Sequence, residues 1–339
     1  MRMKPLTLKD VAHRAGVSPK TVSRVINGEA YVRPEVRAAV QKVVDELGYR
    51  PNAFARELSS SRSFLLGLYF DDPASTYAAD LQRGALARCR ALGYHLVVEQ
   101  VTRDQPDWLA QCEASLRAMR LGGAILTPPL CDWPELLDLF ARMGVAVVRI
   151  SPGDSQDRTA AVEMDESGAA RELTEALLAL GHRDIGFIQG NPEHHAAARR
   201  HQGFEAAMQA AGLPLRPDRT LPGDFTFRSG LAAGERLLGG ADRPSAIFAA
   251  NDEMALGVLV AAMRAGIPVP DQLSIAGFDD AAIARMAWPP LSTVHQPHVE
   301  MAAAAVELLT QSPAGAPGAP PLRRLPHRLT LRDSTGPAR

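Results

Sequence analysis

The segment SPKTVSRVIN near the start of the chain places five polar side chains on one helical face, namely Lys20, Thr21, Ser23, Arg24 and Asn27. Cations, hydroxyls and amides of these types donate hydrogen bonds to phosphate oxygens and to base edges in the major groove of DNA. The opposite face carries Val22, Val25 and Ile26, which have the spacing of a buried stripe. The segment therefore predicts a helix that buries one face and presents the other to a nucleic acid.

A preceding helix and a tight turn are expected to position that polar face. In LKDVAHRA the apolar residues recur at helical spacing, and Gly16 follows where the helix should end. Ser18 and Pro19 have the residue types that begin a second helix. Ser18, Pro19 and Thr7 are therefore also candidate DNA contacts. The spacing is typical of a helix-turn-helix, and the alternative is a helical hairpin whose polar face is only solvated.

A third helix and a short segment complete this basic part of the chain. Apolar residues keep helical spacing from Pro34 until Gly48 ends the pattern, so three helices can share a small core. PNAFAREL follows, and a helix of about two turns is not stable alone in water, so this segment is expected to order on a partner. We assign residues 1–50 to a helix-turn-helix domain and 51–62 to a hinge helix and linker.

Charge separates this region from the rest of the chain. The formal net charge of the 339 residues is −1, yet residues 1–62 hold 12 Lys and Arg against 6 Asp and Glu. The remaining residues carry a net charge of −7. A basic end on an acidic chain suits a polyanionic partner.

Cysteine usage and hydropathy indicate a soluble, cytoplasmic protein without a membrane span. Cys89, Cys112 and Cys131 are odd in number and lack a C-x-x-C spacing, so buried thiols are expected. The sequence has neither an N-terminal apolar signal region nor a run of about 18 apolar residues.

Beyond a serine-rich link, short apolar runs alternate with helical patterns, from FLLGLYF to VAVVRIS and again from DIGFIQG to LSIAGFD. Strands separated by helices of this length form βαβ units and parallel sheets covered on both faces. We therefore expect an all-α head plus an α/β bilobal body with two doubly wound parallel sheets. Residues 63–161 and 294–311 are assigned to one lobe, and residues 162–293 and 322–335 to the other.

Ligands of parallel α/β sheets bind beyond the carboxyl ends of the strands, so the polar residues near those ends are candidates. The candidates are Asp72, Tyr77, Thr127, Ser151, Arg200, Asn251 and Asp279. Carboxylates and amides bond vicinal hydroxyls in fixed directions, and arginine adds a rigid fork of donors. The set suits a polyhydroxylated ligand such as a sugar.

Other polar residues have simpler explanations. For Asp252 and Asp280 we prefer helix capping. His194 and His195 are expected to be loop or surface residues, because helical neighbours point about 100° apart and do not chelate one metal. The sequence has no G-x-G-x-x-G, P-loop, G-x-S-x-G or H-E-x-x-H pattern. We therefore expect no catalytic residue, no metal and no cofactor.

Over nearly its whole length the chain resembles the lactose-repressor family of bacterial transcription regulators. The resemblance is carried by LKDVAHRAGVSPKTVSRVIN, PNAFAREL, LGHR, RHQGF, ANDEMALG and IAGFDD. It implies a body like that of periplasmic binding proteins, with double-stranded operator DNA and a small-molecule effector as partners. A homodimer is expected, because no leucine heptad of the kind that makes some relatives tetrameric follows the last strand.

The resemblance also implies roles for individual residues. It places SPKTVSRVIN in the major groove and PNAFAREL in the minor groove, where Asn52 and Ala55 contact DNA and Leu58 wedges between base pairs. Arg200, Asn251 and Asp279 match effector contacts.

Two stretches depart from better-known relatives and leave the effector's identity open. Ser151 and Pro152 stand where an aspartate is common, and DDPASTY follows the first strand.

The expected function is that of an effector-responsive repressor of carbohydrate-utilisation genes, released from a palindromic operator by a sugar-type ligand. One alternative is a purine or nucleoside sensor that needs its ligand as a corepressor. Another is a solute-binding protein of the same bilobal fold, which the basic head disfavours. An enzyme built on the same sheets is disfavoured by the missing catalytic patterns.

Overall fold

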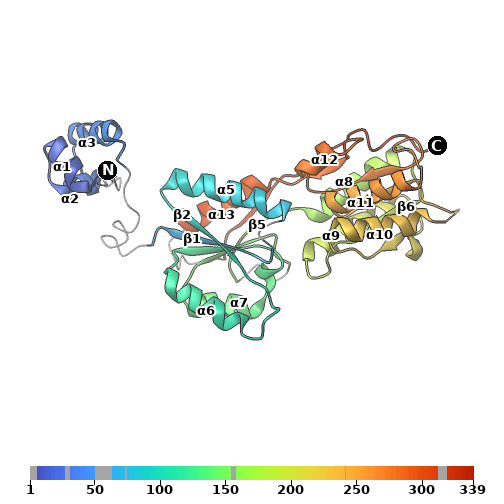
Figure 1. The fold of residues 1–339 in the computed structure, drawn as a ribbon, viewed down its shortest axis with the longest axis horizontal. Helices are drawn as coiled ribbons and strands as arrows, with labels where there is room; N and C mark the ends of the chain where they lie inside the picture. The colour runs from blue at the N-terminus through green and yellow to red at the C-terminus, as the bar shows by residue number, and fades with distance from the viewer. Residues whose placement is uncertain are drawn as a thin grey trace. The chain divides into compact units, whose positions relative to one another are not determined.

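The computed structural model describes residues 6–26, 31–49, 63–72, 75–153, 158–240, 242–311 and 319–339 (Figure 1). The chain divides into two compact units, Met1–Phe64 and Leu65–Arg339. In the described ranges, no helix is both long and apolar enough to cross a membrane.

The first unit contains three helices, as the sequence predicts. They are α1 (Leu8–Ala15), α2 (Pro19–Ile26) and α3 (Pro34–Leu47). Gly16 and Gly48 end α1 and α3 with φ angles of 65° and 59°, a left-handed conformation that glycine adopts without steric cost. Val11, Val22 and Val40, one from each helix, are fully buried against one another in a single small core.

The first lobe of the second unit is built on a six-stranded parallel sheet with the order β11-β5-β4-β3-β1-β2. The strands are β1 (Leu65–Phe70), β2 (His95–Gln100), β3 (Gly123–Leu126), β4 (Val147–Ile150), β5 (Ala160–Met164) and β11 (Leu322–Leu325). Helices α5 (Thr76–Leu92) and α13 (His298–Gln311) pack on one face, and α6 (Trp108–Met119) and α7 (Pro134–Arg142) on the other, with the short helix η1 (Leu130–Asp132) before α7 (Figure 1).

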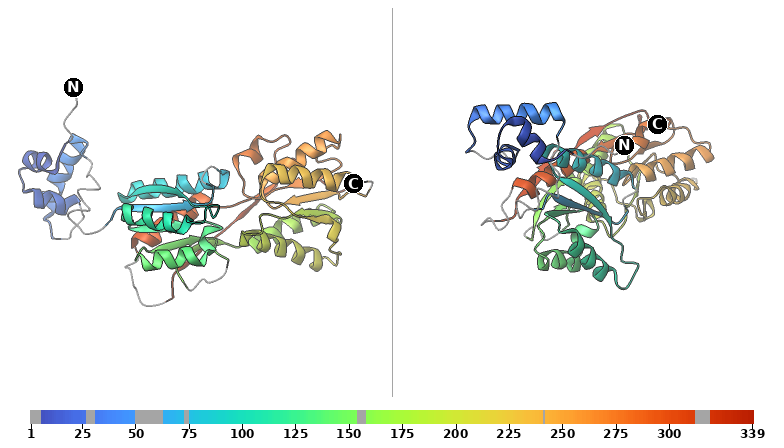
Figure 2. Two further views of the ribbon diagram at one scale, coloured as in Figure 1. Left: turned by 60° about the horizontal axis from the view of Figure 1, so that its bottom comes forward. Right: turned by 60° about the vertical axis from the view of Figure 1, so that its left-hand side comes forward.

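The second lobe has a four-stranded parallel sheet with the order β7-β6-β8-β9. Its strands are β6 (Ile185–Ile188), β7 (Thr220–Leu221), β8 (Ala246–Ala249) and β9 (Ser274–Ala276). Helices α8 (Glu166–Ala179) and α9 (His195–Ala210) lie on one face, and α10 (Phe227–Leu238) and α11 (Asp252–Arg264) on the other (Figure 2). The remaining elements are η2 (Pro217–Arg219), α12 (Ala282–Met286) and the antiparallel pair β10 (Thr293–His295) and β12 (Arg328–Thr330).

The chain passes between the lobes after β5, after β10 and after β11, and this corrects three predicted boundaries. Residues 162–164 of β5 belong to the first lobe, and residues 294–295 of β10 belong to the second. Residues 322–335 were assigned to the second lobe, but β11 adds an edge strand to the first sheet by pairing in parallel with β5. The later part of this range lies in the second lobe, where β12 pairs with β10 and Ser334 bonds to Ile275 and Ser292. The strand β11 alternates exposed and half-buried side chains, and such a pattern is satisfied on the edge of either sheet.

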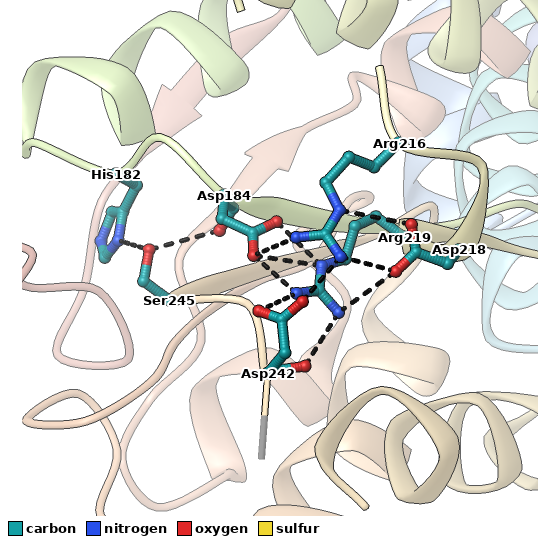
Figure 3. A network of polar contacts seen from close by, with 7 residues as sticks. All are labelled: His182, Asp184, Arg216, Asp218, Arg219, Asp242 and Ser245. Atoms are coloured by element: carbon teal, nitrogen blue, oxygen red, sulfur yellow. Dashed lines mark hydrogen bonds and ion pairs between the residues drawn. The ribbon is translucent and has the colours of Figure 1, made fainter. Parts of the chain in front are cut away.

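A network of ion pairs connects the amino end of β6 to the amino end of β7 (Figure 3). Arg219, which is 6% exposed, donates Nε to Oδ1 of Asp184 at 2.8 Å and Nη2 to Oδ2 at 2.7 Å. Arg216 donates Nη2 to Asp242 at 2.7 Å and to Asp218 at 2.8 Å. The bidentate Arg219 pair is the strongest geometry in this network, so it fixes the start of β7 against the start of β6.

Candidate functional site

A cavity of about 220 Å³ lies between the two lobes at the carboxyl ends of strands from both sheets. The lining residues come from both lobes and are mostly polar: Asp71, Asp72, Ser75, Thr76, Tyr77, Pro128, Ser151, Glu166, Asn191, His194, Ala196, Arg200, Asp224, Phe225, Thr226, Asn251, Glu253, Asp279 and Gln296. Such a cavity, with many convergent donors and acceptors, suits a small polar ligand.

Arg200 is the buried cation of this cavity and is only 5% exposed. Its Nε donates to Oε2 of Glu166 at 2.8 Å, and its Nη1 donates to the backbone oxygen of Ala250 at 2.6 Å. Nη1 also lies 3.5 Å from Oδ1 of Asp279, and Cζ lies 4.0 Å from the centroid of the Phe278 ring. The guanidinium is therefore fixed in place before any ligand arrives, with Nη2 free of bonds to the described residues.

Asp279 faces Arg200 from the loop after β9 and has an unusual backbone. Its φ of 115° is outside the regions that non-glycine residues normally adopt. Its carboxylate accepts a hydrogen bond from Nε2 of Gln296 at 2.5 Å. Burial raises the pKa of Asp279 to about 7, although Arg200 and Gln296 act in the opposite direction and lower it. The group can thus change its proton occupancy near neutral pH.

Asn251 both caps a helix and lines the cavity. Its Oδ1 accepts from the backbone N–H of Met254 at 3.0 Å, and its Nδ2 donates to the backbone oxygen of Phe225 at 2.9 Å. The adjacent Asp252 is fully buried and accepts from the hydroxyl of Thr293 at 2.7 Å. Asp252 is thus structural, but the helix-capping role preferred for it is wrong, because Asn251 is the N-cap of α11. Asp280 does not cap a helix either, since Ala281 is the N-cap of α12 and Asp280 pairs with Arg332.

Two aromatic side chains add apolar surface to the polar wall. The ring of Tyr77 contacts the buried ring of His298 edge to face, with centroids 4.8 Å apart, and Phe225 contacts His194 in the same way at 5.4 Å. Burial, together with the charges of Arg200 and His295, lowers the pKa of His298 to about 3, so this imidazole is neutral. Apolar ring faces beside fixed donors and acceptors match the two kinds of surface on a pyranose or furanose ring.

Three contacts join the lobes across the cavity. Thr76 of α5 donates its hydroxyl to Oε1 of Glu253 in α11 at 2.9 Å. Arg199 of α9 donates Nη2 to the backbone oxygen of Gly153 at 2.6 Å. His194 lies 3.9 Å from the carboxylate of Asp71. The relative position of the lobes therefore depends on residues at or next to the cavity.

Several residues with a strained backbone conformation line this cavity. Among the described residues, five non-glycine residues have positive φ, and three of these, Ser151, Phe225 and Asp279, line the cavity. Such conformations persist where the surrounding structure enforces them and are frequent at ligand sites.

Six of the seven predicted effector contacts line this cavity: Asp72, Tyr77, Ser151, Arg200, Asn251 and Asp279. Thr127 does not, and the prediction for it is corrected. Its side chain is fully buried and donates to the backbone oxygen of Tyr69 at 2.8 Å, so it turns back onto β1. The next residue, Pro128, reaches the cavity instead.

Several lining residues escaped the sequence analysis. Glu166 follows β5 and Phe225 follows β7, so the rule for the ends of parallel strands could have found both. Gln296 follows β10, which belongs to an antiparallel pair, so that rule gives no signal for it. His194 was expected to be a loop or surface residue, and it does lie in the loop directly before α9, but it is partly buried in the cavity wall. No group of three potential metal ligands occurs in the part of the chain that the structure describes.

The head presents the predicted polar face on α2. Lys20 and Arg24 are exposed one helical turn apart, while Val22 and Val25 are buried behind them. The backbone N–H of Thr21 donates to Oγ of Ser18 at 3.1 Å, which makes Ser18 the N-cap that the sequence predicts. Thr7 donates its N–H and hydroxyl to Asp10 at 2.7 and 2.6 Å. The exposed face thus consists of cations and hydroxyls on a helix held by its apolar side.

Comparison with known proteins agrees with both units. Residues 7–52 match the family model "Bacterial regulatory proteins, lacI family", and residues 174–335 match "Periplasmic binding protein-like domain". Catabolite control protein A of Priestia megaterium is 33% identical over 333 residues, which cover 97% of this chain and 99% of the relative. The chain belongs to the lacI family. It is a DNA-binding transcriptional repressor with an effector-binding body.

Solved structures of lacI-family proteins have the same fold over almost the whole chain. The transcriptional regulator CelR in its cellobiose complex has a TM-score of 0.74 at 31% identity, covering 97% of this chain and 99% of that one. The lac repressor dimer bound to operator and the anti-inducer ONPF has a TM-score of 0.76 at 29% identity, covering 98% of this chain and all of the other.

For this lacI-family repressor, part of the predicted DNA contacts falls outside the described residues. These are Asn27 and the hinge residues Asn52, Ala55 and Leu58. The remaining predicted contacts, Thr7, Ser18, Pro19, Lys20, Thr21, Ser23 and Arg24, lie in the described part of the head and are exposed or half-buried.

The repressor has a second cavity of about 250 Å³ at the opposite, amino ends of β6 and β7. Its floor is apolar and includes Phe204 and Met208, and its rim includes Arg216 and Arg219. Both arginines are already paired with the aspartates of the network in Figure 3. The third arginine of the lining, Arg183, donates Nη1 to the backbone oxygens of Leu178 and His182.

Proposed function

We propose that this repressor controls carbohydrate-utilisation genes, binds a palindromic operator as a homodimer in the cytoplasm, and releases it when a sugar enters the cavity. The observation that carries the proposal most directly is the convergence of Arg200, Asn251 and Asp279 on one cavity. Their fixed donors and acceptors suit vicinal hydroxyls, and the rings of Tyr77 and Phe225 supply apolar faces. The CelR relative in its cellobiose complex has the same fold, which supports a sugar as ligand.

Operator recognition is assigned to α2. In this proposal Lys20 and Arg24 contact bases or phosphates in the major groove, while Thr7, Ser18, Thr21 and Ser23 position the helix. A two-fold symmetric dimer places two such helices on half-sites about one helical turn apart, which is why a palindromic operator is expected.

Release follows from linkage between the cavity and the lobes. A ligand shifts an equilibrium between two arrangements only by the difference between its affinities for them. A sugar bonded to Arg200 in the second lobe and to Asp72 or Ser151 in the first binds best when the lobes are together. In the proposal, this arrangement is the one in which the two heads of the dimer no longer fit the operator.

A purine sensor is less well supported by the cavity. A planar base would be held best between two parallel aromatic rings. Among the described lining residues, the rings of Tyr77 and Phe225 contact His298 and His194 and do not pair with each other.

Two experiments test the proposal with the full-length protein. Selection of binding sites from random DNA should yield a palindrome, and a monomeric or unstructured site would contradict the dimeric assignment. A thermal-shift screen should then find a sugar that raises the melting temperature, because a ligand that binds only the native state stabilises it by mass action. Stabilisation by nucleobases alone would replace the sugar by a purine.

A further inference from the structure

The effector cavity has an unusual balance of charge. Six carboxylates line it, namely Asp71, Asp72, Glu166, Asp224, Glu253 and Asp279, whereas Arg200 is the only Lys or Arg among the described lining residues. In a cleft with low-dielectric walls, charges of one sign reinforce one another and act on a ligand more strongly than in water. The charge that a ligand carries is therefore a strong determinant of whether it can enter.

Arg200 does not offset this excess, because its own charge is already balanced. Glu166 accepts from its Nε at 2.8 Å, and Asp279 lies 3.5 Å from its Nη1. Two carboxylates thus face one guanidinium, and only Nη2 remains for a ligand. A phosphate would have to compete with Glu166 and Asp279 for the same cation.

Two other carboxylates of the lining, Glu253 and Asp224, bond to neutral partners. Glu253 accepts from the hydroxyl of Thr76 at 2.9 Å, and Asp224 accepts from the backbone N–H of Thr226 at 2.9 Å. Within the described chain, neither has a Lys or Arg at ion-pair distance. His194, which lies 3.9 Å from Asp71, adds little positive charge at neutral pH because burial lowers its pKa.

Helix N-termini, the usual backbone sites for phosphate, are mostly occupied here. Ser75, Thr226 and Asn251 line the cavity and each caps the helix that it precedes, accepting from the N–H of Ala78, Ser229 and Met254. Helix α9 lacks a side-chain cap, although the N–H of Ala197 in its first turn already donates to the backbone oxygen of His194 at 2.9 Å. The cavity thus has many acceptors for ligand hydroxyl or amino groups and few donors for an anion.

We propose that the effector is a carbohydrate without a negatively charged group and that an amino group on that carbohydrate strengthens its binding. This inference rests on the proposed function of the cavity and narrows its ligand class. It excludes sugar phosphates, sugar acids and nucleotides, and it ranks an amino sugar above its neutral parent.

The test uses calorimetric titration of full-length protein with matched ligands. A panel of neutral mono- and disaccharides identifies the best neutral ligand, and its amino, phosphate and carboxylate derivatives are then titrated at neutral pH. One charge acting at short range in such a cleft changes affinity by about tenfold or more. The expected order is amino derivative first, neutral parent second, and both anions at least about tenfold weaker than the parent.

The outcomes separate this inference from the proposed function. If the phosphate or carboxylate binds as tightly as the neutral parent, the charge inference is wrong while a sugar-responsive repressor still stands. An amino derivative weaker than its parent overturns the second half of the inference. If no carbohydrate of any charge binds, and a nucleobase does, the proposed function itself fails.

Charge-neutral substitutions localise the effect. Glu253→Gln and Asp224→Asn keep the acceptor oxygens but remove one negative charge each from the wall. Each variant should raise the ratio of phosphate affinity to neutral-sugar affinity several-fold. Asp271→Asn is the matched control, since Asp271 lies outside the cavity and pairs with Arg339 at 2.9 Å. An equal change of the ratio in the control would mean that net protein charge, and not the cavity wall, excludes anions.

Discussion

Arg199 of the second lobe donates a hydrogen bond from Nη2 to the backbone oxygen of Gly153 in the first lobe, at 2.6 Å. The N–H of Gly153 in turn donates to both carboxylate oxygens of Asp132 at 3.0 Å. Asp132 lies 3.5 Å from the fully buried Arg149 on β4. A continuous set of polar contacts thus runs from the core of the first lobe to the residue next to Arg200, which lines the effector cavity.

We expect Arg199→Ala to weaken effector binding. The variant removes a contact that exists only when the lobes are together, so the ligand must supply the lost stabilisation. A charge-assisted hydrogen bond contributes roughly 1.5 kcal/mol or more, which corresponds to about a tenfold loss of affinity in calorimetric titration. Arg264→Ala, on the exposed side of α11, is the matched control and should bind as the wild type does. Equal affinity in the Arg199 variant would mean that the contact does not contribute to closure.

Variants of the ion pair between Arg200 and Glu166 distinguish the effect of Arg200 on protein stability from its effect on ligand affinity. Arg200→Gln leaves the buried Glu166 without a partner and should destabilise the body by about 3 to 5 kcal/mol in urea unfolding. Adding Glu166→Gln removes the unpaired charge and should restore much of that loss. Effector affinity should stay low in the double variant, because the guanidinium is still missing. If affinity returned together with stability, Arg200 would be a structural residue only.

Asp279 predicts a pH dependence of stability with a definite sign. Its pKa is raised by burial to about 7 in the folded protein, whereas an unfolded aspartate titrates near 4. Between about pH 4 and pH 7 the native state therefore holds a proton that the unfolded state has lost. The stability contributed by this group should fall as the pH rises through that window and level off above it.

The measurement is the free energy of unfolding of wild type and Asp279→Asn at several pH values without ligand. As the pH rises through this window, the free energy of unfolding of the wild type should fall relative to that of Asp279→Asn by up to about 1.4 kcal/mol per pH unit. Parallel curves for the two proteins would show that Asp279 does not titrate there.

The general position of the cavity followed from sequence, but its detailed wall did not. Asp72, Ser151 and Asn251 could be placed at the cavity from sequence, because they are polar and lie just after predicted strands. Parallel strands bring their carboxyl ends to one edge of the sheet. Side-chain direction is a different matter, as Thr127 shows by turning back onto the Tyr69 carbonyl. No sequence pattern signals such a turn.

Pairings between residues far apart in the chain could not be predicted from the sequence either. Arg200 meets Glu166 across 34 positions, and β11 joins β5 across more than 150, so neither neighbour is encoded by local spacing. The head was more predictable, since its caps and buried stripe are set within a few residues. Gly16, Ser18 and Gly48 end or begin helices as their residue types predict.

Lys20 and Lys42 lie on different helices of the head, and their substitution should affect operator base preference differently. Lys20 is exposed at the start of α2, whereas Lys42 lies on α3 with its side chain 78% exposed. Lys20→Ala should change the preferred operator bases by roughly 1 to 3 kcal/mol per base pair. Lys42→Ala removes the same charge and should leave base preference unaltered. Binding-site selection on both variants checks this, and unchanged preference for Lys20→Ala would remove Lys20 from base contact.

Two exposed, large apolar side chains at the end of α12 predict where copies of the chain meet. Met286 and Trp288 are 80% and 84% exposed, which is unusual for residues of their size. We expect Trp288→Asp to shift the dimer toward monomer in sedimentation and to weaken operator binding, with the exposed Met263→Asp on α11 as control. A variant that remains dimeric at the same concentration would place the interface elsewhere.

The most direct test of a sugar-released repressor is titration of the best-binding sugar into a preformed complex of the full-length protein with its selected operator, followed by fluorescence anisotropy of the DNA. The sugar should lower operator affinity by about tenfold or more. Because binding and release are reciprocally linked, the sugar concentration for release should lie between its dissociation constants for the free protein and for the operator complex, which differ by the same factor. The Arg200→Gln/Glu166→Gln variant should hold the operator normally and need far more sugar for release. If the sugar saturates the cavity while operator affinity stays constant, the protein is not a sugar-released repressor.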